Sequence, residues 1–232
     1  MTTDTIEQSQ RTFNHYALFS FKDAYWSLSA DERADFHKNW LAALRASAQK
    51  VDLYQGTEHD VDLIVWSALT VKDNQDSAIF FEKFAKALTP YRHLIEQKDS
   101  LWGFTRPSQY SKARSKQEID PFSEERKPYL IIYPFSKTTE WYLMSREARQ
   151  GMMNEHIEIG HRFPTVRLNT TYSFGLDDQE FVVAFESDRP EHFLDLVMEL
   201  RHAEASNYTL KDTPIFTCIH RELPEVLDTL GG

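Results

Sequence analysis

The order of the expected elements is the strongest constraint on this chain, because one alternation of strands and helices runs through it twice. In the first half, Ser29-Ala-Asp-Glu32 has the spacing of a capping box and begins a helix, while Thr89-Pro90 ends a second helix. Apolar runs with strand character lie before, between and after them. The expected strands are 15–22, 51–55, 61–69 and 101–105, and the expected helices are 29–49 and 77–88. This is the ferredoxin-like order, strand–helix–strand–strand–helix–strand.

The second half repeats that order without visible sequence identity to the first. Ser145 can cap a helix that Gly160 ends, and Pro190 suits the first turn of a later helix. The expected strands are 129–135, 166–174, 181–186 and 215–219, with helices at 145–160 and 190–202. We therefore expect an α+β fold of two ferredoxin-like (βαββαβ) halves, residues 1–111 and 128–232, in which the first half serves packing and assembly.

A charged connector at 112–127 joins the two halves and contains Pro121. It is either a solvated linker or a mobile flap. As a flap, it would bring Lys112, Arg114 and Lys116 toward an acidic ligand.

Charge and composition exclude several classes of function. The 232 residues carry 26 Lys and Arg against 36 Asp and Glu, a net charge of −10, without a basic stripe, which disfavours nucleic acid and a polybasic membrane anchor. The single cysteine, Cys218, excludes an internal disulfide and fits a reducing cytosol. The polar N-terminus lacks a signal-peptide core and no apolar run reaches transmembrane length. We expect a cytoplasmic protein without membrane insertion.

One histidine, His156, shares a face of the predicted 145–160 helix with Ala148, Met152 and Ile159. A neutral imidazole in apolar surroundings is a natural axial ligand for haem iron, although a lone buried histidine is more often structural. Glu204 is either a carboxylate that bonds the far ring nitrogen or a surface residue at a helix end.

The strand expected at 166–174 has two different faces, because side chains alternate along a strand. Val166, Leu168, Thr170, Tyr172 and Phe174 share one face, and Arg167, Asn169, Thr171 and Ser173 share the other. If the Leu168 face lies toward a cofactor, the pocket opposite His156 is apolar and has no guanidinium. The Arg167 face would then meet solvent or another subunit.

Tyr133, Ser136 and Lys137 lie where a strand ends, and Trp141 follows them. The tyrosine and the tryptophan can be ordinary core residues, and the lysine a surface charge. On composition alone these ordinary interpretations are preferred, so the case for a site depends on the neighbouring motifs.

Several ordered motifs at compatible spacing carry a resemblance that covers nearly all of the chain and is strongest over 129–216. They are Tyr133-Pro-Phe-Ser-Lys137, Glu140-Trp-Tyr142, Met152-Met-Asn-Glu-His156, Gly160, Ser173-Phe-Gly-Leu-Asp-Asp178, Gln179-Glu-Phe-Val182, Leu200-Arg201, Glu204-Ala-Ser206 and Thr213-Pro-Ile-Phe216. In these segments the chain resembles the chlorite dismutase and coproheme decarboxylase family, and most closely the coproheme decarboxylase branch. The resemblance implies two ferredoxin-like halves in a dimeric α+β barrel-like subunit, a porphyrin in the C-terminal half, and a homo-oligomer, usually a pentamer.

The resemblance also implies a proximal side for the porphyrin. His156 matches the proximal iron ligand, and Glu204 matches the carboxylate that hydrogen-bonds it. Trp141 falls at an aromatic position near the same side.

A second set of matches concerns the acidic arms of the porphyrin. Tyr133 matches the tyrosine of the decarboxylases that is oxidised to a radical beside a propionate, and Lys137 matches the lysine that assists that propionate. Ser206 matches a hydroxyl that contacts another propionate.

Leu168 departs from part of the family pattern. Chlorite dismutases have Arg at the matching distal place and one decarboxylase branch has Gln, whereas the actinobacterial decarboxylases have a small apolar residue there. A shifted alignment gap would place Asn169 at that position instead. The actinobacterial type also uses a distal histidine from the region before Tyr133, and 112–127 contains none. The group that accepts the proton of peroxide is therefore not identified.

The leading hypothesis is a haem-biosynthesis enzyme that converts iron coproporphyrin III (coproheme) to haem b by oxidative decarboxylation driven by hydrogen peroxide. The alternatives are a haem-dependent chlorite dismutase and a non-catalytic haem-binding protein. A chlorite dismutase needs a positive distal group, and a carrier has no need of Tyr133 with Lys137.

Overall fold

Each half of the chain forms one sheet covered by helices. The computed structural model describes residues 11–111, 115–221, 225 and 229. The first half comprises β1 (Arg11–Phe21), α1 (Asp23–Trp26), α2 (Ala30–Arg45), β2 (Lys50–Gly56), β3 (Leu63–Val71), α3 (Asp76–Leu88), the 3-10 turn η1 (Thr89–Tyr91) and β4 (Ile95–Phe104). The second comprises β5 (Tyr129–Lys137), α4 (Thr139–Leu143), α5 (Arg146–His161), β6 (Val166–Tyr172), β7 (Phe181–Ser187), α6 (Pro190–His202), η2 (Glu204–Tyr208), β8 (Thr209–Lys211) and β9 (Phe216–His220).

The strand order confirms the predicted α+β fold. The first sheet runs β4-β1-β3-β2 and the second runs β6-β7-β5-β9, each the order of a ferredoxin-like half. The β2–β9 and β4–β6 pairings join the two sheets, and the β5–β7 pairing closes the strands into a ring, with β8 added beside β5. The subunit is therefore a barrel built from two similar halves.

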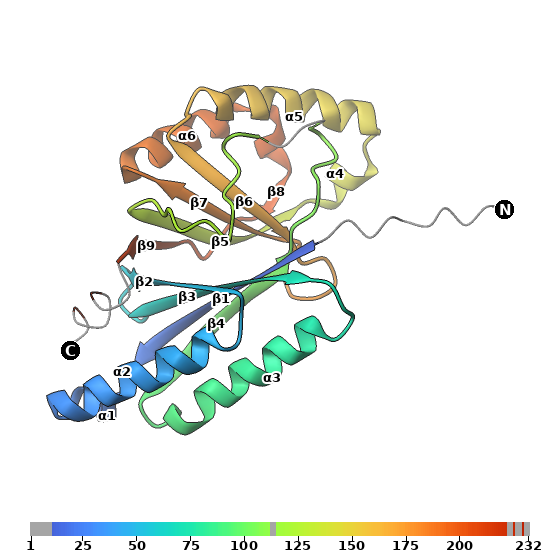
Figure 1. Ribbon diagram of the computed structural model, residues 1–232. Coiled ribbons are helices and arrows are strands. Elements are labelled where there is room, and N and C mark those ends of the chain that lie inside the picture. The colour runs from blue at the N-terminus through green and yellow to red at the C-terminus, as the bar shows by residue number, and fades with distance from the viewer. Residues whose placement is uncertain (1–10, 112–114, 222–224, 226–228, 230–232) are drawn as a thin grey trace.

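Helices cover both outer sides of this barrel. In Figure 1, α2 and α3 lie below the strands while α5 and α6 lie above them. The space between the two sheets is filled by one apolar cluster that includes Tyr16, Trp66, Ile132 and Ala184. Both faces of each sheet are thus covered, one by the other sheet and one by helices.

The two helix layers are packed very differently. Below the first sheet, one large cluster joins strands to helices, with Phe19, Trp40, Leu63 and Phe84 nearly or fully buried. Above the second sheet, the described buried residues form only two small clusters. These are Ile159, Val166, Leu196 and Ala203 in one, and Trp141, Met152 and Ala205 in the other. The second half therefore buries much less apolar surface between its helices and its sheet.

Local sequence signals set most helix ends. The capping box at Ser29 and Glu32 is present, Ser145 caps α5, and Pro190 is in the first turn of α6. Gly160 does not end α5, because the helix runs to His161 and its C-cap, Arg162, has an ordinary right-handed conformation.

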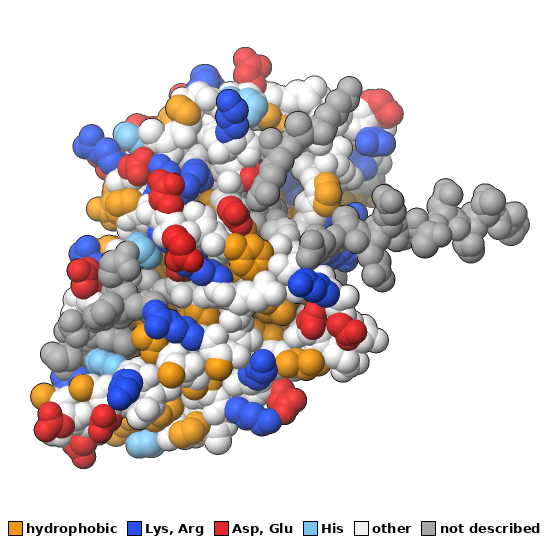
Figure 2. Space-filling model, in the orientation of Figure 1, with side chains coloured by type: hydrophobic (Ala, Val, Ile, Leu, Met, Phe, Trp, Pro, Cys, Tyr) orange, Lys and Arg blue, Asp and Glu red, His pale blue; other side chains and the backbone are white. Residues whose placement is uncertain are grey.

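Most of the connector is attached to the barrel, so neither earlier interpretation describes residues 115–127. Ile119 is 2% exposed and belongs to the cluster between the sheets. Lys116 is exposed, while Lys112 and Arg114 lie outside the described residues. Figure 2 shows charged side chains of both signs spread over the visible surface. Over 11–111 and 115–221, no helix has both the length and the apolar character needed to cross a bilayer.

Candidate active site

The candidate site lies on the side of β5, β6 and β7 that faces α5 and α6, called here the C-terminal helix face. Phe185 marks this side, because its ring lies 4.9 Å from Phe193 of α6 and it packs against the cluster containing Ile159 of α5. Residues paired directly across antiparallel strands project to the same side. Two rows therefore cross this face, Ile131–Phe185–Leu168 and Tyr133–Val183–Thr170. All of these side chains except Ile131 are only half-buried.

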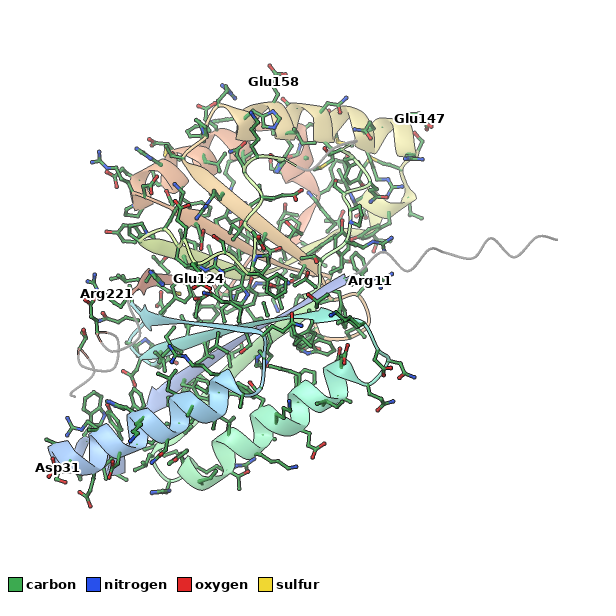
Figure 3. The ribbon with its side chains drawn as sticks, in the orientation of Figure 1. Arg11, Asp31, Glu124, Glu147, Glu158 and Arg221 are labelled. Carbon is green, nitrogen blue, oxygen red and sulfur yellow. The ribbon has the colours of Figure 1, made fainter. Side chains whose placement is uncertain are left out.

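His156 comes from the helix above this face. Glu147 and Glu158 point outward from α5 in Figure 3, whereas His156 is half-buried and lies one turn beyond the buried Met152. Burial, with a smaller contribution from the charge of Lys137, lowers the pKa of His156 to about 4. The imidazole is therefore neutral near pH 7. It makes no hydrogen bond with the part of the chain that the structure describes.

Lys137 lies at the end of β5 among apolar and aromatic groups. Its Nζ donates a 2.7 Å hydrogen bond to the carbonyl of Ala205 and lies 4.6 Å from the centre of the Trp141 ring. Burial lowers the pKa of Lys137 to about 8. The side chain is thus a cation that is only weakly hydrated, close enough to His156 to affect its protonation.

Tyr133 lies four residues before that lysine on β5, in the middle of the C-terminal helix face. Its ring stacks on Phe185 at a centroid distance of 6.1 Å, and burial raises the pKa of its hydroxyl. Both Arg201 and Asp212 are near enough to influence that pKa, and they form a 2.6 Å ion pair with each other. The phenol is therefore neutral and half-buried at physiological pH.

Glu204 and Ser206 lie on η2, which packs beside α5. The backbone N–H of Glu204 donates to the carboxylate of Glu155 at 3.1 Å, while its own side chain is exposed. The Ser206 hydroxyl lies 2.8 Å from the carbonyl of Ala203. The structure brings this segment to the His156 helix but does not place the Glu204 carboxylate on the imidazole.

The two faces of β6 differ from expectation in one respect. The guanidinium of Arg167 bonds Glu186 at 2.7 Å, Glu186 is fully buried, and 21% of the Arg167 side chain stays exposed. Asn169 also points between the two sheets, where its amide donates to Asn14 at 3.2 Å. The expectation of a solvent-facing Arg167 face was wrong for Asn169, Thr171 and Ser173, which are buried because the second sheet is covered on both sides. Leu168, not Asn169, belongs to the C-terminal helix face.

Two further groups support this site, and sequence reasoning gave neither of them a role. Glu180 accepts a 2.8 Å hydrogen bond from the backbone N–H of Lys137 and also bonds the hydroxyl of Tyr142. Tyr110 packs against Trp141 at 6.4 Å, and its buried hydroxyl has no hydrogen-bond partner among the described residues. No spacing rule could find either, because both contacts join segments far apart in the chain.

Comparisons with known proteins place the chain in one family. The family model for chlorite dismutase matches residues 27–221. A coproheme decarboxylase from Mycolicibacterium smegmatis is 30% identical over 162 residues, which cover 70% of this chain and 68% of that protein. This chain belongs to the chlorite dismutase family, a family of enzymes.

Solved structures support the same fold. The chlorite dismutase from Candidatus Nitrospira defluvii in complex with imidazole superposes with a TM-score of 0.79 at 22% identity and 95% coverage of both chains. A variant of that enzyme in complex with cyanide gives a TM-score of 0.80 at 23% identity, again with 95% coverage of both chains. These values support the fold.

Proposed function

We propose that this protein is a coproheme decarboxylase, which converts iron coproporphyrin III to haem b with hydrogen peroxide as oxidant. The observation that carries the proposal is the meeting of three groups on one half-buried face: a neutral imidazole, a half-buried lysine and a half-buried phenol. They are His156, Lys137 and Tyr133. The relative from Mycolicibacterium smegmatis is named as a coproheme decarboxylase.

The residues present fit an iron porphyrin. The described residues contain no group of three or more His, Cys, Asp or Glu that could hold a bare metal ion. A single neutral imidazole suits an iron whose other ligands come from a macrocycle. The half-buried row Tyr133–Val183–Thr170 offers an apolar surface for such a ring, and Lys137 offers a cation to its carboxylates.

Each residue then has a definite task. His156 would hold the iron, and Leu168 would line the pocket from the strand that faces the His156 helix. Iron with peroxide supplies the oxidising power when the substrate is bound. Tyr133 gives up its hydroxyl proton and one electron, and then removes a hydrogen atom from a propionate. Lys137 holds that carboxylate as a compact charge, helped by the low polarity around Trp141.

The balance of the reaction is simple. Each propionate side chain with its proton, together with one hydrogen peroxide, becomes a vinyl group, one carbon dioxide and two waters. The carbon–carbon bond to the carboxyl group breaks, and a carbon–carbon double bond forms. Two propionates react on each substrate molecule. The substrate therefore either turns within the site or reacts there twice.

Three other positions have supporting roles in this proposal. Glu204 is the candidate partner for the far nitrogen of His156, since its segment is tied to α5 through Glu155. Ser206 is a candidate donor to a second propionate, and Trp141 packs beside the proximal side.

A chlorite dismutase is the second candidate, and the geometry of β6 weakens it. Holding a chlorine oxyanion on the distal side requires a positive group there. Leu168 is apolar, and the guanidinium of Arg167 is turned to the opposite side of the sheet by Glu186. A non-catalytic haem carrier is the third candidate, but it would not need an oxidisable phenol beside a lysine.

One experiment separates the three. The purified protein is loaded with iron coproporphyrin III and titrated with hydrogen peroxide, and the porphyrin is weighed by mass spectrometry. We expect the mass to fall in two steps, each by one carboxyl group and one hydrogen. An unchanged porphyrin would support the carrier, and sustained oxygen release on adding chlorite to the haem-loaded protein would support the dismutase.

We also propose that the enzyme is a cytoplasmic homo-oligomer, with a pentamer as the expected size. Large apolar side chains on α6 and β8 support an assembly surface, since Leu194, Met198 and Leu210 are 55%, 60% and 71% exposed. Light scattering on the full chain measures the mass directly. A single copy of 27.2 kDa at working concentration would rule the assembly out.

A further inference from the structure

One edge of β6 is completed by the connector, which is named here the strap for its residues 115–126. β6 pairs along its whole length with β7 but meets β4 at only one position, Phe104↔Tyr172. Further along that free edge, the N–H of Leu168 donates to the carbonyl of Gln117 at 2.8 Å, and the N–H of Ile119 donates to the carbonyl of Leu168 at 2.9 Å. The backbone of Leu168 is therefore bonded to the strap through both its donor and its acceptor.

The side chain of Gln117 binds a second part of the same region. The two N–H groups of its amide nitrogen are shared among three backbone carbonyls, those of Gly160 at 3.2 Å, Phe163 at 3.0 Å and Val166 at 3.0 Å. These carbonyls belong to the last turn of α5, to the following loop and to the first residue of β6. One amide thus joins the end of the His156 helix to the start of the Leu168 strand.

The other end of the strap is fixed to the barrel. The Arg126 side chain, with 1% exposed, bonds Asp52 of β2 at 2.9 Å and the carbonyl of Pro121 at 2.7 Å. Its guanidinium also lies 4.7 Å from the centre of the Trp66 ring. With Ile119 buried between the sheets, the strap is held at both ends and cannot shift without exposing these groups.

We propose that Gln117 is a positioning residue that sets the separation between His156 and Leu168. The inference rests on the proposed function, because it is the porphyrin that would lie between these two residues. Gly160 is one helical turn beyond His156, so a bond to its carbonyl limits both sliding and tilting of that end of α5. The same residue fixes Leu168 through the backbone.

The test compares two changes at Gln117 with two matched controls. Gln117→Glu keeps the size of the side chain but replaces the donor with a carboxylate that faces three carbonyl oxygens, and Gln117→Ala removes the side chain. Lys116→Ala changes the exposed neighbour in the strap. Ser47→Ala removes a buried hydroxyl that donates to Leu44, and so weakens the first half without touching the strap.

Two measurements are made on each full-length protein. The first is amide hydrogen exchange at Leu168 and over the last turn of α5, without added porphyrin. We expect exchange at least about tenfold faster in Gln117→Ala, as befits the loss of one or two buried hydrogen bonds. The second is the iron–imidazole stretching band, together with the dissociation constant, after loading with iron coproporphyrin III. We expect a shifted or broadened band and roughly tenfold weaker binding in both Gln117 variants.

The outcomes are distinct. Unchanged exchange and an unchanged band in Gln117→Ala would overturn the proposal, as would equal effects in Ser47→Ala, which would indicate general loss of stability. If Gln117→Glu does not fold, Gln117→Ala decides. If the unaltered protein does not bind the porphyrin, the proposed function fails, and exchange at Leu168 and α5 alone decides whether Gln117 holds the two elements together.

Discussion

Among single side chains, Tyr133 gives the sharpest test of the proposed chemistry. Tyr133→Phe removes the hydroxyl but keeps the ring that stacks on Phe185. We expect the dissociation constant for iron coproporphyrin III to change by no more than about twofold, and turnover to fall by more than about a hundredfold. The rate is followed as loss of porphyrin mass after peroxide is added. Tyr129→Phe on the same strand is the control, and normal turnover in Tyr133→Phe would remove the tyrosine from the mechanism.

The lowered pKa of Lys137 predicts how the affinity for the substrate depends on pH. Its pKa of about 8 means that the side chain is charged below pH 8 and loses its proton above it. A bound carboxylate favours the charged form, so affinity for iron coproporphyrin III should fall as the pH rises through 8, by up to about tenfold per unit. Lys137→Met should bind weakly at pH 7 and show a flatter profile between pH 7 and 9. Parallel profiles for the two proteins would show that another group is responsible.

The sequence could identify single residues only where the contact is local. Tyr133 and Lys137 are found because they belong to one short motif on one strand whose resemblance to the family gives them roles, and period-two alternation separates Leu168 from Arg167. The sequence did not indicate which side of β6 faces the helices, because both sides of a strand in this barrel are covered. The partner of Arg167 is Glu186 on the neighbouring strand, and the orientation of the Glu204 side chain depends on how η2 meets α5.

At the scale of one element, the start of α2 is the clearest case of sequence setting structure. The Ser29 hydroxyl accepts a hydrogen bond from the backbone N–H of Glu32, and the Glu32 carboxylate accepts one from the backbone N–H of Ser29. We expect Ser29→Ala to lower the free energy of unfolding by about 1 kcal/mol, measured by urea denaturation. Glu32→Ala combined with Ser29→Ala should cost less than the sum of the two single changes. Simple additivity would mean that the two bonds act separately.

Elements that the sequence did not reveal share one physical property, which is that they are short. The helices α1 and α4, the turns η1 and η2 and the strand β8 span too few residues for a hydrophobic period to show. The strap is a different case, because its charges predict solvent exposure. The residues that decide its position, Gln117 and Ile119, act through contacts with β6 that no composition rule describes.

Across the whole molecule, the two halves have the same strand order but differ in how tightly the space between sheet and helices is packed. Val65 and Val183 each lie on the third strand of their half and face its helices. Val65 is fully buried in the large cluster with Ala17, whereas Val183 lies half-buried directly across from Tyr133. The repeated order could be predicted from sequence, but this asymmetry could not, since both residues are valines in apolar strands.

The asymmetry predicts opposite responses to one and the same substitution. Val65→Phe adds volume to a full core and should lower the free energy of unfolding by about 1–3 kcal/mol. Val183→Phe adds the same volume to a face that is already partly open, so its effect on unfolding should stay below about 1 kcal/mol, while affinity for iron coproporphyrin III should fall at least tenfold. Urea denaturation without porphyrin and absorbance titration with it provide the two values. Equal destabilisation by both changes would mean that the second half is as tightly filled as the first, and would leave no room for a porphyrin beside His156.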